Sequence, residues 1–175
     1  MKHITKSLLG LGILFLFLAS TYIASAKRIH DKNYRYKITI PKTALQIQDS
    51  TSEKGTLYYD TSRDIVLIIS GRESSFNSVK EYIDCSNTEL EAKLKQSFGD
   101  TTLTMISCSR SEFYPEQTAV VHFLLGDVQS GFNTYTIYFI HNKNEDLQIS
   151  FTYNKDAEQK DITYIEDVMH TLKLF

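Results

Sequence analysis

Alternating apolar and polar side chains predict that most of this chain forms β-strands. The stretch YRYKITIP, residues 34–41, alternates apolar or aromatic residues with polar ones until Pro41 interrupts the pattern. A period of two is typical of a strand with one buried face. Similar patterns predict strands at 44–49, 55–60, 64–70, 101–108, 118–126, 132–141 and 147–154. The run Ile65 to Ile69 is apolar throughout, so we expect that strand to be central and covered on both faces.

The hydrophobic period becomes helical in two places. After Ser78 it predicts a helix over about 77–85, a restart near Asn87 and a second helix that ends at Phe98, before a glycine. A later amphipathic pattern predicts a helix over about 156–171. Short polar connections make the last three strands an antiparallel meander. The predicted fold class is therefore α+β, a central antiparallel sheet flanked by helices in an α/β/α sandwich.

The first 26 residues have the pattern of a signal peptide. Lys2 and Lys6 precede twelve apolar or glycine residues, 8–19, and the segment ends in Ala-Ser-Ala at 24–26. This core is short for a membrane span, which favours cleavage after Ala26. The alternative is an uncleaved anchor over residues 8–26. Both interpretations place the remaining chain outside the cytoplasm, either periplasmic or secreted, or anchored to the membrane by this segment alone.

Residues 27–175 are long enough for a single compact domain. They contain 17 Lys and Arg against 21 Asp and Glu, a net charge of −4. A nucleic-acid-binding protein would carry a clustered basic surface, so we expect no nucleic-acid partner. Cys85 and Cys108 are the two cysteines of the chain. In an oxidising compartment, an even count predicts a disulfide between them; two buried free thiols are the alternative.

The same segments resemble the PsbP/Mog1/DcrB-like superfamily of single-domain α/β/α sandwiches. The resemblance covers about residues 34–175 and rests on YRYKITIP, DIVLIIS, SVKEYI, the meander TAVVHFLLG, FNTYTIYFIH and LQISFTYN, and the closing DITYIEDVMHTLKLF. One departure is the absence of tryptophan, which many relatives carry shortly after the first proline. The resemblance implies a non-catalytic binding or accessory role, often in the bacterial cell envelope.

No catalytic, cofactor or metal motif stands out in the sequence. Gly-x-Ser-x-Gly, Ser-x-x-Lys and the glycine-rich phosphate loops are all missing. The segment HNKNED, 141–146, offers oxygen ligands at alternate positions, but the twelfth position of a calcium loop would be Tyr153, so we interpret it as a hairpin turn. His122 lies in an apolar strand and is expected to be a satisfied core or edge histidine. We predict no cofactor, no metal and no catalytic residue.

Two loops supply the candidate recognition surface. The segment SRSEFYPE, 109–116, places two aromatic residues beside an arginine, and ISGRESS, 69–75, follows the buried strand. Loops with aromatic and arginine side chains commonly form binding surfaces. The candidate binding residues are Arg72, Glu73, Arg110, Phe113 and Tyr114. On this hypothesis, alanine at Phe113 and Tyr114 would leave the melting temperature nearly unchanged.

The sequence therefore favours an exported, non-catalytic binding or accessory protein of the bacterial cell envelope. Its partner would be another envelope protein or a small ligand. Two alternatives stay open at this point. One is an immunity or inhibitor protein against a toxin, which an acidic, compact, exported domain would suit. The other is a hydrolase whose site is assembled only in three dimensions.

Overall fold

The computed structural model describes residues 26–175 except 33–34, 42, 48–54, 75, 99–101, 128–130, 143–144 and 158. For residues 26, 72, 96–98 and 127 it describes the backbone but not the side chain. The predicted leader therefore lies outside the described residues, apart from the backbone of Ala26. None of the helices within the described ranges is long and apolar enough to cross a membrane. The elements are β1 (Ala26–Asp31), β2 (Tyr36–Pro41), β3 (Ala44–Ile47), β4 (Gly55–Asp60), β5 (Ile65–Glu73), α2 (Val79–Asp84), α3 (Asn87–Phe98), β6 (Thr102–Arg110), β7 (Thr118–Asp127), β8 (Gly131–Asn142), β9 (Glu145–Asn154), α4 (Gln159–His170) and β10 (Lys173–Leu174).

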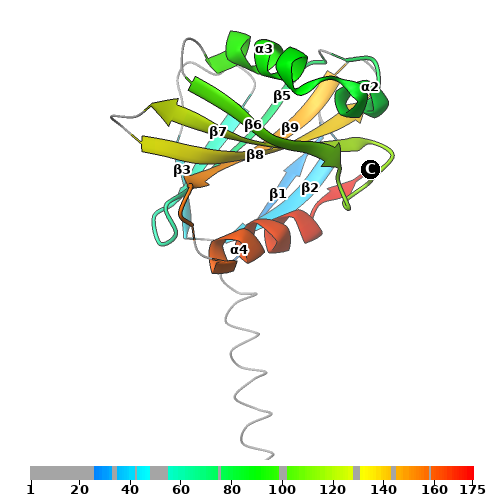
Figure 1. Ribbon diagram of the computed structural model, residues 1–175. Helices are drawn as coiled ribbons and strands as arrows, with labels where there is room; N and C mark the ends of the chain where they lie inside the picture. Colours follow the sequence, from blue (N-terminus) through cyan, green and yellow to red (C-terminus); the bar gives the residue numbers. More distant parts are fainter. Residues whose placement is uncertain are drawn as a thin grey trace, which may run out of the picture.

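The strands form two antiparallel sheets. The larger sheet has the order β3-β4-β5-β9-β8-β7-β6, and the smaller sheet has the order β1-β2-β10. Helices α2 and α3 cover one face of the larger sheet, and α4 lies on the opposite face together with the smaller sheet (Figure 1). The predicted fold class and the predicted meander are confirmed. The strands β1 and β10 were not predicted.

The larger sheet separates two hydrophobic clusters. On β7, Val121 and Phe123 pack with α2 and α3, whereas Val120 packs in the cluster that contains α4. Strands β8 and β9 add apolar residues to both sides by the same alternation. Each large apolar side chain that is fully buried contributes about 1.5–3 kcal/mol relative to exposure. The meander is therefore stable only when both of its faces are covered.

Strand β5 is covered less evenly than the sequence predicts. Ile65, Leu67 and Ile69 are at most 3% exposed and face α4 and the smaller sheet. Val66 and Ile68, on the other face, are half-buried. The reason is visible in Figure 1, where α2 and α3 lie over the β6 side of the sheet. The expectation of cover on both faces was correct for one face only.

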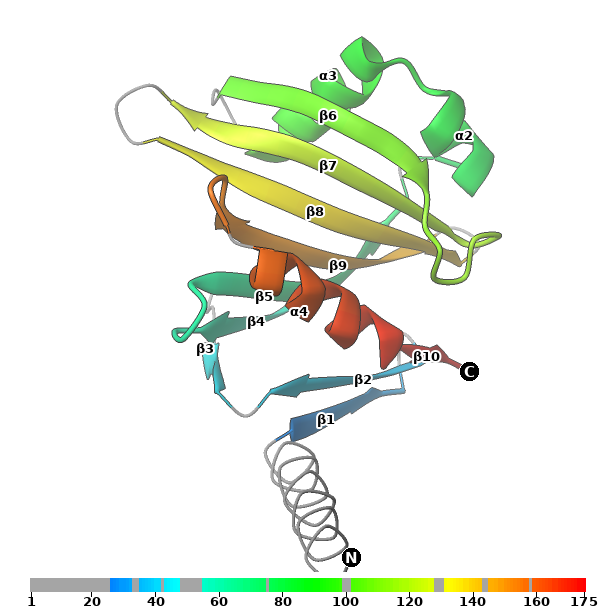
Figure 2. The ribbon, with the colours of Figure 1, turned by 60° about the horizontal axis from the view of Figure 1, so that its bottom comes forward.

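The C-terminal segment ties α4 to the smaller sheet. Thr171 Oγ1 accepts a hydrogen bond from Thr39 N at 2.8 Å and lies 3.2 Å from Thr39 O. Strand β10 then pairs with β2, and Phe175 N donates to Arg35 O at 3.0 Å. In Figure 2, α4 lies between the larger sheet and the smaller one. The helix is therefore fixed on two sides.

A buried carboxylate joins the α2 side of the fold to the meander. Asp146, at the start of β9, is 0% exposed. Its Oδ2 accepts from Ser74 Oγ at 2.9 Å and from the hydroxyl of Tyr82 on α2. Its Oδ1 lies 3.0 Å from Nδ1 of His141, and because a carboxylate only accepts, that nitrogen carries the proton. The hairpin turn predicted at 141–146 is present, but its last residue points into the protein.

Replacing this carboxylate tests its structural role. Asp146→Asn keeps the shape of the side chain. It replaces one carboxylate oxygen, a hydrogen-bond acceptor, with an NH2 group that donates toward Ser74, Tyr82 or His141. Since a buried unpaired polar group is costly, we expect the free energy of unfolding to fall by about 2–4 kcal/mol. Urea unfolding followed by circular dichroism measures it, with the exposed Asp156→Asn as the control. Equal midpoints for the two variants would contradict this role.

Candidate functional site

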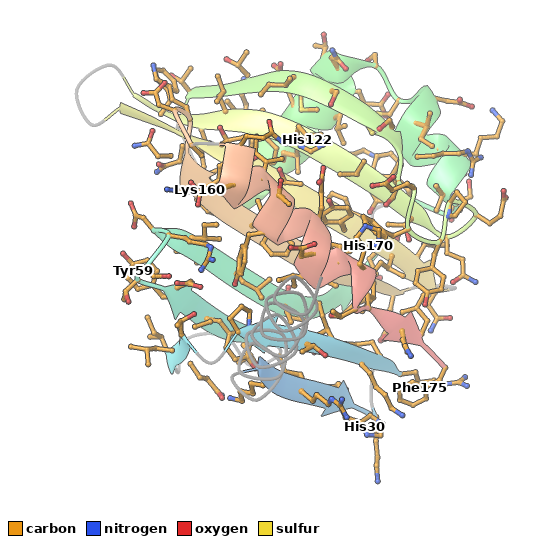
Figure 3. The ribbon with its side chains drawn as sticks, turned by 90° about the horizontal axis from the view of Figure 1, so that it is seen from below. His30, Tyr59, His122, Lys160, His170 and Phe175 are labelled. Carbon is orange, nitrogen blue, oxygen red and sulfur yellow. The ribbon has the colours of Figure 1, made fainter. Side chains whose placement is uncertain are left out.

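A cavity of about 300 Å³ lies between α4 and the larger sheet. It is formed by the β6–β7 loop, by strands β7, β8 and β9, and by one face of α4. Figure 3 views this side of the molecule, with His122 beside α4 and His170 at the last turn of that helix. The lining residues are Arg110, Ser111, Glu112, Phe113, Val120, His122, Thr136, Tyr138, Tyr153, Ile162, Ile165 and Glu166.

Three polar side chains form a hydrogen-bonded row across the strands that line the cavity. His122 Nδ1 on β7 lies 2.9 Å from Thr136 Oγ1 on β8, and this hydroxyl lies 3.0 Å from the hydroxyl of Tyr153 on β9. Burial lowers the pKa of His122, so its imidazole is neutral at neutral pH. The row therefore offers the cavity hydrogen-bonding groups without positive charge.

Aromatic rings form a corner of the cavity. Phe113 and Tyr138 have ring centroids 6.1 Å apart and an interplanar angle of 67°. His170 meets the Phe113 ring edge-on at 4.8 Å. Tyr138 is 7% exposed, and its pKa is raised by burial first and then by the charges of Glu166, Tyr153 and Glu112. Its hydroxyl therefore stays protonated at neutral pH.

Charged residues stand at the mouth of the cavity. Glu112 in the β6–β7 loop and Glu166 on α4 are both exposed. Arg110 Nη1 donates to the carbonyl of Pro115 at 2.9 Å and lies 3.9 Å from Glu116 Oε2. The arginine is thus held against its own loop, and its charge is compensated there.

The structure brings together three of the five candidate residues from the sequence. Arg110 and Phe113 line the cavity. Tyr114 lies in the same loop, with φ of 52°, and its hydroxyl donates to Leu172 O at 3.2 Å. A positive φ in a tyrosine is uncommon and shows that this loop is held in place by its contacts.

The other two candidates lie elsewhere. Glu73 is exposed at the end of β5, and three strands separate β5 from β6 in the sheet. The backbone of Arg72 pairs with that of Asp146, and its side chain is outside the described part of the structure. Glu73 is not among the residues that line the cavity.

Phe113 has a structural role that the sequence did not reveal. Its half-buried ring packs against the hydrophobic cluster beneath α4. Alanine at this position would remove a large apolar contact, and such changes typically lower stability by several kcal/mol when the site is buried. The expectation that Phe113→Ala leaves the melting temperature unchanged is therefore replaced by an expected loss of stability.

Most cavity residues were missed by sequence reasoning. His122, Thr136 and Tyr153 come from three strands, and Glu166 comes from the final helix. For the three strand residues, the common signal is a polar or hydroxyl-bearing side chain on the apolar face of a predicted strand. Strand register is needed to bring such positions together, and one sequence does not supply it. The sequence predicted that the hydrogen-bonding nitrogens of His122 would find partners, and its contact with Thr136 agrees with this.

The side-chain types of a serine hydrolase meet beside the β8–β9 hairpin, but in another arrangement. Ser74 Oγ is 3.4 Å from Nδ1 of His141, the same nitrogen that faces Asp146. In a catalytic triad the serine faces the opposite ring nitrogen. The hydroxyl of Ser74 also lies 2.6 Å from the carbonyl of Phe76 and 2.9 Å from Asp146 Oδ2, which share its single proton. The geometry is that of a structural hydrogen-bond network.

The two cysteines are free thiols in the structure, so the predicted disulfide is not formed in it. Both are half-buried and pack against the α2–α3 cluster. Cys108 Sγ donates to Tyr82 O at 3.4 Å instead. Burial, together with the neighbouring Cys85, raises the pKa of Cys108 to about 11, so the thiol is protonated at neutral pH.

Metal ligation has little support in the described part of the chain. No group of three or more His, Cys, Asp or Glu side chains there is arranged to hold a metal ion. The described cavity residues instead offer hydroxyls, aromatic rings, an imidazole and carboxylates. Such groups recognise a ligand by hydrogen bonding, ring contacts and charge.

The sequence matches no model of a known protein family and no curated protein. Its fold, however, resembles solved structures. The solution structure of cyanobacterial PsbP (CyanoP) from Synechocystis sp. PCC 6803 superposes with a TM-score of 0.62 at 15% identity, covering 87% of this chain and 94% of that one.

A crystal structure of a protein from Bacteroides thetaiotaomicron VPI-5482 gives a TM-score of 0.50 at 14% identity. The match covers 86% of this chain and 49% of that one, so this chain spans about half of its length. At these identities the likeness concerns the fold. The resemblance seen in the sequence is confirmed at that level: this chain has a PsbP-like fold.

Proposed function

We propose that this chain is an exported binding or accessory protein that recognises its partner at the cavity beneath α4 without covalent chemistry. The observation that carries the proposal is the make-up of that cavity. Its row of His122, Thr136 and Tyr153 presents hydrogen-bonding groups, its walls are aromatic and its mouth is charged. Apolar pockets with a few convergent polar groups are the usual form of ligand sites.

The leader supports the proposed compartment. Residues 1–26 carry the basic start, short apolar core and Ala-x-Ala end of a signal peptide. We place the remaining chain in the periplasm or outside the cell, as part of a bacterial envelope. Membrane contact would be confined to residues 8–26 in an uncleaved form. The partner is another envelope protein or a small ligand, and the acidic chain argues against nucleic acid.

Site-specific photocrosslinking tests this surface. A benzophenone amino acid replaces Glu112 at the mouth of the cavity in one variant and Glu116, whose side chain is 92% exposed, in another. Both positions lie in the β6–β7 loop and both residues are exposed, so the pair is matched for element. Irradiation in the native envelope is expected to give a discrete adduct at position 112 that mass spectrometry identifies, and at least fivefold less at position 116.

Two results would contradict the proposed surface. One is equal labelling at positions 112 and 116, which would indicate nonspecific contact with a partner and no defined binding site. The other is a lack of any adduct at position 112 while a crosslinker at Ser78, on the α2 side of the sheet, captures a partner.

We also propose that Cys85 and Cys108 form a disulfide once the protein reaches an oxidising compartment. The two thiols pack against the same hydrophobic cluster, the one formed by α2, α3 and the meander. A bridge closing a loop of this length is worth roughly 3 kcal/mol in the chain-entropy model. Mass spectrometry of the exported protein without reductant should show one linked peptide pair. Full alkylation of both thiols in the folded protein would refute the bridge.

A further inference from the structure

We propose that the cavity beneath α4 binds a small molecule with a positively charged ammonium head group. This inference rests on the proposed function, because it names the ligand class of the same site. It follows from three features of the cavity: the balance of its charges, the arrangement of its aromatic rings and the position of its hydroxyl groups.

The charges around the cavity favour a cation. Glu112, in the β6–β7 loop, and Glu166, on α4, approach the cavity from different elements, and both line it. Arg110, the single arginine among the lining residues, donates to the carbonyl of Pro115 at 2.9 Å and lies 3.9 Å from Glu116 Oε2, so one guanidinium faces two lining carboxylates. The lining residues therefore present a net negative potential to a ligand.

The imidazole in the cavity does not offset this potential. Burial lowers the pKa of His122, and its Nδ1 is hydrogen-bonded to Thr136 Oγ1 at 2.9 Å. At neutral pH the ring is uncharged and contributes a polar surface only. An anionic ligand would meet two carboxylates without an uncompensated cation among the described lining residues.

Aromatic rings provide a second attraction for an ammonium group. The faces of Phe and Tyr rings attract cations, by about 0.5–1 kcal/mol when exposed and by more when desolvated. Phe113 and Tyr138 meet at 67° and form a corner rather than a stack, and Tyr153 lines the same cavity. Such a corner, closed by carboxylates, is the arrangement that recognises quaternary ammonium groups.

The remaining lining residues suit an ammonium compound with a short polar tail. Val120, Ile162 and Ile165 offer apolar contacts for N-methyl groups. The hydroxyls of Thr136 and Tyr153, already 3.0 Å apart, can hydrogen-bond to a tail hydroxyl. Choline has this combination of groups and serves as the probe.

Isothermal titration of the full exported chain compares choline with 3,3-dimethyl-1-butanol, which has the same shape with carbon in place of the charged nitrogen. We expect choline to bind at least tenfold more tightly. Glu166→Gln should weaken choline binding at least threefold and leave the neutral compound unaffected. Its neighbour on α4, the exposed Asp167→Asn, is the matched control and should change neither. A parallel titration with phosphatidylcholine vesicles distinguishes a free ligand from a lipid head group.

Four results would overturn the inference. Equal binding of the two compounds shows that charge is not recognised, although the cavity then remains a binding site. Equal weakening by Glu166→Gln and Asp167→Asn shows a general surface effect. Failure of both compounds to bind, combined with a specific crosslink at position 112, refutes the ammonium ligand and leaves the proposed function standing. Failure of binding and of that crosslink together refutes both.

Discussion

The architecture depends on the need to exclude water from both faces of the β7–β8–β9 meander. Val121 and Phe123 point to one side, Val120 and Tyr138 to the other, and each side belongs to a separate hydrophobic cluster. A sheet that is apolar on both faces requires a layer on each. Helices α2 and α3 supply one layer, and α4 with the smaller sheet supplies the other (Figure 2). Asp146 joins the meander to the α2 side.

The cavity is a consequence of how the second layer is attached. Thr171 and strand β10 hold the end of α4 against the smaller sheet, and Tyr114 ties the β6–β7 loop to Leu172. The helix thus leaves space over parts of β7, β8 and β9. Polar residues on the meander, which a fully packed core would exclude, line that space. Fold stability and recognition therefore share the same helix.

Periodicity predicted the elements well, because period two and period 3.6 report burial directly. It did not predict β1 or β10, since β1 directly follows the apolar leader and β10 has only two residues. The site was harder to predict: Arg110 and Phe113 were identified from loop composition, but the packing of Phe113 requires three-dimensional contacts. His122, Thr136 and Tyr153 meet only through strand register, and the inward turn of Asp146 is not encoded in the local pattern of its hairpin.

The most direct test of recognition beneath α4 is the mapping of amide chemical shifts during a titration with choline. The account predicts the largest, saturable changes at His122, Thr136 and Tyr153 and along α4, with little change in α2 and α3. Changes centred on α2 and α3, or on the separate cavity lined by Gln117, Asn142 and Phe175, would contradict the central claim that the cavity beneath α4 is the binding site of the protein.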